Sequence, residues 1–173
     1  MKVIYTIHRY DVSIFTWVTR RKTLNTLAKA ARIVSKTADG PLYLLLALAL
    51  FFGGAEPQHS LLHTFLIAFA IERPIYLALK NIFRRNRPPV ALNIQGFVIP
   101  SDRFSFPSGH TSGAFLIATL ISVFYPAWIM PLLIWATLVG LSRVVLGVHF
   151  PTDTLVGAFM GSGLALLALQ IPV

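Results

Sequence analysis

Residues 127–153 read AWIMPLLIWATLVGLSRVVLGVHFPTD, and this stretch decides the fold class of the chain. Its first part, up to Gly147, is almost wholly apolar and matches the ~20 residues that an α-helix needs to cross a bilayer. Comparable apolar segments cover residues 41–55, 61–83, 108–125 and 154–171. The pattern therefore predicts an all-α, integral-membrane helical bundle in which five segments span the membrane.

Length and composition agree with one membrane domain. The chain has 173 residues with a mean hydropathy of +0.70; 55% of them are hydrophobic and only 12% are charged. This composition excludes an ordinary soluble globular protein. The absence of cysteine excludes disulfides, thiolate nucleophiles and zinc–thiolate sites. We expect a single domain over residues 1–173, with a basic amphipathic N-terminal segment (1–40) and a transmembrane bundle (41–173).

The N-terminal segment carries a predicted amphipathic helix over residues 12–36. Lys22, Lys29 and Lys36 recur every seven residues on one face, and apolar residues recur at helical spacing on another: Trp17, Leu24, Leu27, Ala31 and Val34. The helix either lies on the membrane or packs against the bundle as an ordinary surface helix. If residues 3–19 cross the bilayer, the bundle has six transmembrane helices. In a membrane protein, the net charge of +9 indicates contact with anionic lipids and not with nucleic acid.

Three short polar strings stand at the ends of apolar segments. They are KNIFRRNRP at residues 80–88, PSGH at 107–110 and SRVVLGVHFPTD at 142–153. Because the helices of a bundle end at a membrane surface, we expect the strings to meet at one face. Together they supply the positive charge and the donors beside a helix start that a phosphate pocket needs. The cations are Lys80, Arg87 and Arg143, and the donors are Ser108 and Gly109.

His149 and Asp153 provide the elements of a nucleophilic site. A histidine attacks phosphorus when one ring nitrogen is free and a carboxylate holds the N–H of the other. The four-residue spacing places Asp153 about one helical turn after His149, so its side chain leans back toward that ring. For this pair alone, a helix-capping aspartate beside an unrelated histidine is the more common arrangement. The two other strings favour the catalytic interpretation.

In order and spacing, the strings resemble the motifs of the type 2 phosphatidic acid phosphatase family: K-x6-R-P, P-S-G-H and S-R-x5-H-x3-D match at every fixed position. The resemblance implies a membrane lipid phosphatase that hydrolyses a phosphomonoester or diphosphate on a lipid. It implies that His149 becomes a phosphohistidine oriented by Asp153. It also implies that His110 protonates the leaving group and then activates water.

The same resemblance leaves the lipid open among phosphatidic acid, phosphatidylglycerol phosphate and a polyprenyl diphosphate. A lipid phosphoryl transferase or a non-hydrolytic anionic-lipid binder is the alternative that keeps this pocket. Vanadium haloperoxidases share the motifs but are soluble, which the hydropathy disfavours. We expect no cofactor and no metal, because the chain has no acidic cluster, Walker-type loop or Cys/His ligand set. The expected partners are the lipid substrate and membrane lipids, and no obligate protein partner is evident.

The membrane face of the site stays open. Counting positive charges puts the N-terminal segment and the catalytic ends in the cytoplasm, but Lys80, Arg87 and Arg143 inflate that count. Resemblance to bacterial relatives favours the bacterial cytoplasmic (inner) membrane with the site on its extracytoplasmic face.

Several features lie outside the motifs. The loop over residues 88–107 is either connective or a lid, with Ile94, Phe97, Val98 and Ile99 in the bilayer and Asp102 and Arg103 in water. Glu72 and Arg73 sit inside a predicted span, where we expect structural pairing with other helices. Arg84 is either an auxiliary phosphate contact or an interfacial residue. A row of small residues favours close packing within the bundle over a dimer face: Gly157, Gly161 and Ala165.

Overall fold

The computed structural model describes residues 2–20, 23–53, 56–94, 96–100 and 102–172. Within these residues every regular element is a helix, and there is no β-strand. The helices are α1 (Lys2–Thr19), α2 (Leu24–Lys36), α3 (Gly40–Gly53), α4 (Gln58–Phe83), α5 (Pro88–Leu92), α6 (Gly109–Phe124), α7 (Ile129–Val145) and α8 (Pro151–Ala168), with a 3₁₀ turn at Pro126–Trp128. These elements confirm the predicted all-α class.

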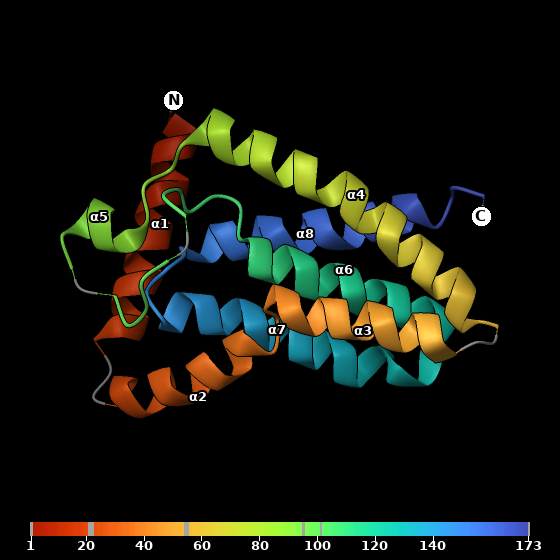
Figure 1. Cartoon of the computed structure of the whole chain (residues 1–173). Helices are drawn as coiled ribbons and strands as arrows, with labels where there is room; N and C mark the ends of the chain where they lie inside the picture. The colour runs from red at the N-terminus through yellow and green to blue at the C-terminus, as the bar shows by residue number, and fades with distance from the viewer. Residues whose placement is uncertain (1, 21–22, 54–55, 95, 101, 173) are drawn as a thin grey trace.

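Helices α3, α4, α6, α7 and α8 run alongside one another, and α6 lies among the others (Figure 1). Leu116 and Leu120 of α6 are fully buried. Helices α6 and α8 pack very closely, since a Cβ added at Gly161 would lie 2.1 Å from the carbonyl oxygen of Ser112. A side chain there would force the two helices apart, so the small-residue row packs within the bundle, as the favoured interpretation predicts.

The five predicted spans correspond to α3, α4, α6, α7 and α8 to within a few residues. In the described part of the chain, three segments are both long and apolar enough to cross a membrane: Leu24–Gly53, Gln58–Phe83 and Pro126–Val145; α6 is a shorter apolar helix. Large apolar side chains face outward, including Phe52 and Phe159 at 79% and 77% exposure. Such surfaces suit a bilayer, and the count of five to six spans stays a prediction.

The N-terminal segment departs from the prediction. A single helix over residues 12–36 is wrong, because α1 ends at Thr19 and α2 begins at Leu24. Helix α1 lies across one end of the bundle (Figure 1), where Phe15 is fully buried against Phe150. Helix α2 packs on α7 through Ala28 and Ala31, so the packed alternative holds for this helix. Lys22 and Ala55, the end of the first predicted span, fall outside the described residues.

Candidate active site

The three polar strings meet at the end of the bundle that α1 crosses. Helix α4 stops at Phe83 because Arg84 adopts a left-handed conformation, with φ 45°, and the chain then turns to the extended Arg87. Lys80 and Arg87, seven residues apart, would share a face only on a continuous helix, and this break prevents it. Arg84 bonds the Asn81 carbonyl oxygen and is exposed, which fits the interfacial interpretation.

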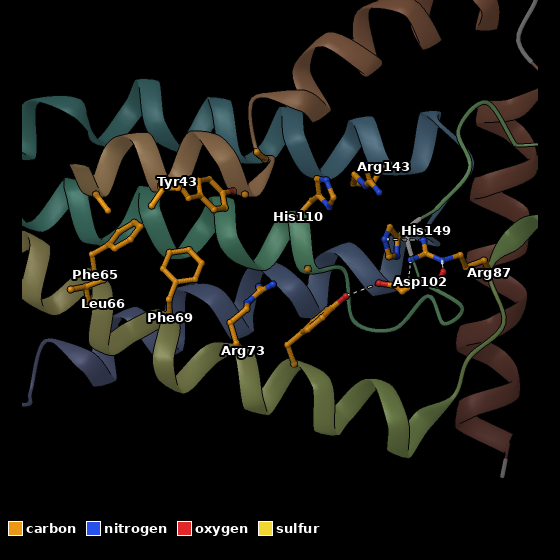
Figure 2. A pocket seen from close by; sticks show the side chains of 16 residues that line it. Tyr43, Phe65, Leu66, Phe69, Arg73, Arg87, Asp102, His110, Arg143 and His149 are labelled. Carbon is orange, nitrogen blue, oxygen red and sulfur yellow. Dashed lines mark hydrogen bonds and ion pairs between the residues drawn. The ribbon is translucent and has the colours of Figure 1, made fainter. Parts of the chain in front are cut away.

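A cavity of about 420 Å³ opens between α3, α4 and this end of the bundle (Figure 2). Its polar end is lined by Arg87, Asp102, Gly109, His110, Arg143 and His149. Its other end lies between α3 and α4 and is apolar, lined by Tyr43, Leu44, Ala47, Phe65, Leu66 and Phe69. The predicted site residues Lys80, Ser108 and Asp153 lie behind this lining, all buried.

His149 stands on the turn between α7 and α8 and is 2% exposed. Its Nε2 lies 3.3 Å from Arg87 Nη1, and its Nδ1 lies 3.8 Å from Asp153 Oδ2. The second distance is an ion-pair distance, too long for a hydrogen bond. Burial lowers the pKa of His149 to about 4, and the charge of Arg87 contributes in the same direction. The ring is therefore neutral at pH 7, with Nε2 unprotonated and accepting a hydrogen bond from Arg87 beside the cavity.

Asp153 occupies the third position of α8 and plays two parts. Its Oδ2 accepts a hydrogen bond of 2.8 Å from the backbone N–H of Phe150, which caps its own helix. The same oxygen is the one nearest His149 Nδ1. Asp153 therefore caps the N-terminus of α8 and also lies beside His149.

A buried network that the sequence analysis missed holds Asp153 from the other side. Arg85 donates to Asp153 Oδ1 at 2.8 Å and to Asp11 Oδ2 at 2.6 Å. Asp11, on α1, also accepts from the backbone N–H of Thr152 at 2.9 Å and is 1% exposed. Helix α1 is therefore connected to the candidate catalytic carboxylate. The basic run at residues 84–87 was the only signal in the sequence, and it did not distinguish Arg85 from its neighbours.

Asp102 joins Lys80 to Arg87, although we expected it in water. Its Oδ2 accepts from Lys80 Nζ at 2.6 Å and from the Tyr76 hydroxyl at 3.0 Å, and its Oδ1 bonds Arg87 Nη2. Burial alone would raise the pKa of Asp102, but the hydrogen bonds from Lys80 and Arg87 hold it at about 2. Two of the three predicted phosphate cations thus already share a carboxylate. In the same loop, Phe97, which we expected in the bilayer, packs instead against protein in a cluster with Ala28.

His110 and Arg143 form the opposite wall of the polar end (Figure 2). His110 Nε2 lies 2.9 Å from Asp39 Oδ1, in the turn between α2 and α3. Arg143 is 7% exposed and donates from Nη1 to Ser35 Oγ at 2.5 Å, while its Nε has no hydrogen-bond partner in the described part of the chain. Nothing in the sequence pattern pointed to Ser35 or Asp39.

The Pro-Ser-Gly-His string opens α6 as predicted, with Ser108 at the N-cap. The Ser108 hydroxyl is fully buried and bonds Thr111, and the Ser108 N–H donates to the Asp153 carbonyl oxygen at 3.0 Å. A Cβ at Gly109 would lie 2.9 Å from the Tyr76 ring, so glycine permits this close packing. Gly109 and His110, in the first turn of α6, line this cavity end, so the helix N-terminus faces it with the N–H groups that suit an anion.

Glu72 and Arg73, inside α4, pair with each other, whereas we expected partners on other helices. Glu72 is fully buried and also accepts from Ser112 Oγ of α6 at 2.7 Å. Arg73 lines the cavity. Among the described residues, no group of three or more histidines, aspartates or glutamates is placed to hold a metal ion.

Comparison with known proteins agrees with this arrangement. The family model of the PAP2 superfamily matches residues 42–173. The chain belongs to the PAP2 superfamily. Phosphatidylglycerophosphatase B of Bacillus subtilis is 32% identical over 133 residues, and undecaprenyl-diphosphatase of Sulfolobus acidocaldarius is 33% identical over 110 residues. These matches cover 70% and 62% of this chain but only 61% and 53% of the relatives.

Solved structures extend the similarity to almost the whole chain. The crystal structure of Aquifex aeolicus LpxE superposes with a TM-score of 0.81 at 28% identity, covering 92% of this chain and 94% of the other. The crystal structure of a transmembrane PAP2-type phosphatidylglycerolphosphate phosphatase from Bacillus subtilis also superposes, with a TM-score of 0.74 at 25% identity over 95% of this chain and 85% of the other. With this fold and its long apolar helices, the chain is an integral membrane protein.

Proposed function

We propose that this protein is a membrane lipid phosphatase that works through a phosphohistidine on His149. One observation carries the proposal: a neutral, buried imidazole presents Nε2 to a cavity that is cationic at that end and apolar at the other. A phosphate headgroup fits the first end and a hydrocarbon chain fits the second. The names of the relatives, a phosphatidylglycerophosphatase and an undecaprenyl-diphosphatase, support a lipid phosphate or diphosphate as substrate.

In the first step, His149 Nε2 attacks phosphorus and the bond from phosphorus to the leaving oxygen breaks. His110 donates a proton to that oxygen. Burial and the charge of Arg143 disfavour its protonated ring, and the Asp39 carboxylate, 2.9 Å from Nε2, partly offsets them. Arg87, Arg143 and the first-turn N–H groups at Gly109 bind the phosphoryl oxygens as charge shifts onto them.

In the second step, water attacks the phosphorus of the phosphohistidine and the phosphorus–nitrogen bond breaks. His110, now neutral, accepts the proton of that water, so inorganic phosphate leaves and both histidines return to their starting states. Asp153 orients His149 through both steps, and Arg85 holds Asp153 in place.

Asp102 has a supporting part in this scheme. It offsets one of the two positive charges of Lys80 and Arg87 in the absence of substrate and fixes where both side chains lie. Lys80 does not line the cavity, so it acts on the site through its hydrogen bonds to Asp102 and Tyr76.

The proposal extends to the setting of the reaction. We place the enzyme in a bacterial cytoplasmic membrane, with residues 1–173 as one catalytic domain and the site on the extracytoplasmic face, on the strength of the family resemblance. Helix α1 contributes to that domain through Asp11.

The test is phosphate release by the purified protein in detergent, given phosphatidic acid, phosphatidylglycerophosphate and a polyprenyl diphosphate. We expect release from at least one lipid in the presence of EDTA. A protein that binds these lipids without releasing phosphate is the non-hydrolytic alternative. Transfer of the phosphate to an added alcohol with no free phosphate identifies a transferase.

A further inference from the structure

Arg73 extends into the cavity between its polar and its apolar end. Figure 2 shows its guanidinium between Phe69 and the His110 side of the cavity. On α4, Tyr76 follows about one turn later and Lys80 about two turns later, so Arg73 lies ~10 Å along the helix axis from Lys80, toward the apolar end. The reaction proposed above does not use this residue.

The guanidinium is held by one edge only. Its Nε bonds Glu72, and its Cζ lies 4.8 Å from the centre of the Tyr76 ring and 5.9 Å from that of Phe69. The two terminal nitrogens make no hydrogen bond with any residue that the structure describes. Because an arginine carries five N–H donors in a rigid fork, this leaves the outer edge free for a ligand.

The two partners of the ion pair differ in exposure. The Glu72 side chain is 0% exposed and also bonded to Ser112, whereas the Arg73 side chain is 46% exposed. A cation in the middle of a membrane helix costs roughly 2.5–3.5 kcal/mol, so an arginine that served only to neutralise Glu72 would be expected to be buried with it. Tyr43 adds a second polar group to this part of the cavity wall, since its hydroxyl is buried without a hydrogen-bond partner in the described residues.

We propose that Arg73 binds a second phosphate of the substrate, one that lies between the phosphate at His149 and the hydrocarbon chain. The inference rests on the proposed phosphatase function and narrows its substrate class. A guanidinium edge binds two phosphate oxygens at once, and the surrounding apolar wall strengthens that contact. Two kinds of lipid place a phosphate there: a diphosphate, or a phosphodiester lipid that carries a terminal phosphomonoester. In phosphatidic acid, only the oxygens of the acyl ester groups lie between the reacting phosphate and the hydrocarbon chains.

The experiment compares Glu72→Gln with the double variant Glu72→Gln/Arg73→Gln. Both lack the buried carboxylate, so they differ only in the guanidinium and neither leaves a buried charge unpaired. Substrates are used in matched pairs: phosphatidylglycerophosphate against phosphatidic acid with the same acyl chains, and a polyprenyl diphosphate against the monophosphate of the same length. Arg84→Gln, at the exposed end of α4, controls for the loss of one positive charge.

We expect removal of the guanidinium to lower kcat/KM about ten- to a hundred-fold for the two-phosphate member of one pair, and less than about threefold for its one-phosphate partner. The pair that responds identifies the source of the second phosphate. Equal losses within both pairs would overturn the inference.

Binding to the same variants in a His149→Ala background separates the inference from the proposed function, because no turnover is needed. A selective loss of affinity for two-phosphate lipids supports the subsite even if the wild-type protein releases no phosphate. Unchanged relative affinities would refute it even if the wild-type protein is an active phosphatase.

Discussion

The two histidines of the site are each paired with a carboxylate, in opposite surroundings. His149 and Asp153 are 2% and 0% exposed and stand 3.8 Å apart. His110 and Asp39 are 29% and 46% exposed and stand 2.9 Å apart. Asp153 is further held by Arg85 and by the Phe150 N–H, whereas no other hydrogen bond to the Asp39 carboxylate joins the described residues.

This difference matches two different chemical tasks. A nucleophile has to keep one nitrogen free of protons and aimed in one direction, which burial and a fixed carboxylate provide. An acid that also serves as a base has to give up and regain a proton in every cycle, which requires contact with water and a nearby charge to stabilise the cation. The buried pair is thus suited to fixed orientation and the partly exposed pair to proton exchange, in which Asp39 offsets part of the effect of burial and of the Arg143 charge on His110.

The largest effect is expected from replacing His149. His149→Ala removes the nucleophile, so kcat should fall on the order of 10⁴-fold or more and no phosphoenzyme should form. Quenching without acid, followed by mass spectrometry of the wild-type protein, should place the phosphate on residue 149. Phosphate found on His110 instead would reverse the roles of the two pairs, and phosphate on Ser108 would overturn the phosphohistidine assignment.

Replacing His110 should cost less and should depend on the leaving group. General acid catalysis is worth about a hundred- to ten-thousand-fold when the leaving oxygen is a basic alkoxide. Because p-nitrophenolate departs without a proton, His110→Ala should slow phosphoenzyme formation much more with a lipid phosphate than with p-nitrophenyl phosphate. Single-turnover rates isolate this step from the later attack of water. Equal losses on both substrates would assign His110 to phosphate binding.

The buried pair also predicts the response to acid. A base whose pKa is lowered to about 4 stays neutral as the pH falls from 7 to 5 and becomes protonated only below about pH 4. Phosphoenzyme formation from p-nitrophenyl phosphate should therefore be about tenfold slower at pH 3 than at pH 5, while the substrate remains mostly a monoanion. Circular dichroism at both pH values checks that the helices persist. A fall of about a hundredfold over the same interval would show that His149 titrates like an ordinary histidine, with a pKa near 6.5.

How much of this the sequence predicts depends on whether a residue's partner is local. The spans follow from apolar runs, and the Pro-Ser-Gly-His helix start and the proximity of His149 and Asp153 follow from spacing within a few residues. Asp39 and His110 are 71 residues apart, and no periodic pattern links them. Asp11 and Arg85 are separated by 74 residues, so only the folded chain brings α1 to the site.

Local rules also fail where one residue changes the direction of the chain. Lys80 and Arg87 would share a face on a continuous helix, but the left-handed Arg84 ends α4 between them. They are joined instead by Asp102, a residue of the loop. Asp102 lies in the one long connection, where sequence rules are weakest.

The smallest effect is expected at Asp39, and it is the most direct test of the exposed pair. Asp39→Asn keeps the size and a hydrogen bond to His110 Nε2 but removes the charge that stabilises the protonated ring. Because a half-exposed ion pair contributes only about 1 kcal/mol, the loss in kcat with a lipid phosphate should be about three- to tenfold. The same variant should leave the rate with p-nitrophenyl phosphate nearly unchanged.

The reason is that Asp39 acts only through His110, so its effect should follow the leaving group in the same way and vanish when His110 is absent. In a His110→Ala background, Asp39→Asn should therefore add almost nothing, because the two changes remove the same interaction. Additive losses would mean that Asp39 fixes the turn between α2 and α3 rather than the proton on His110. In that case the exposed pair would be a structural contact, and the contrast with His149 and Asp153 would lose its chemical meaning.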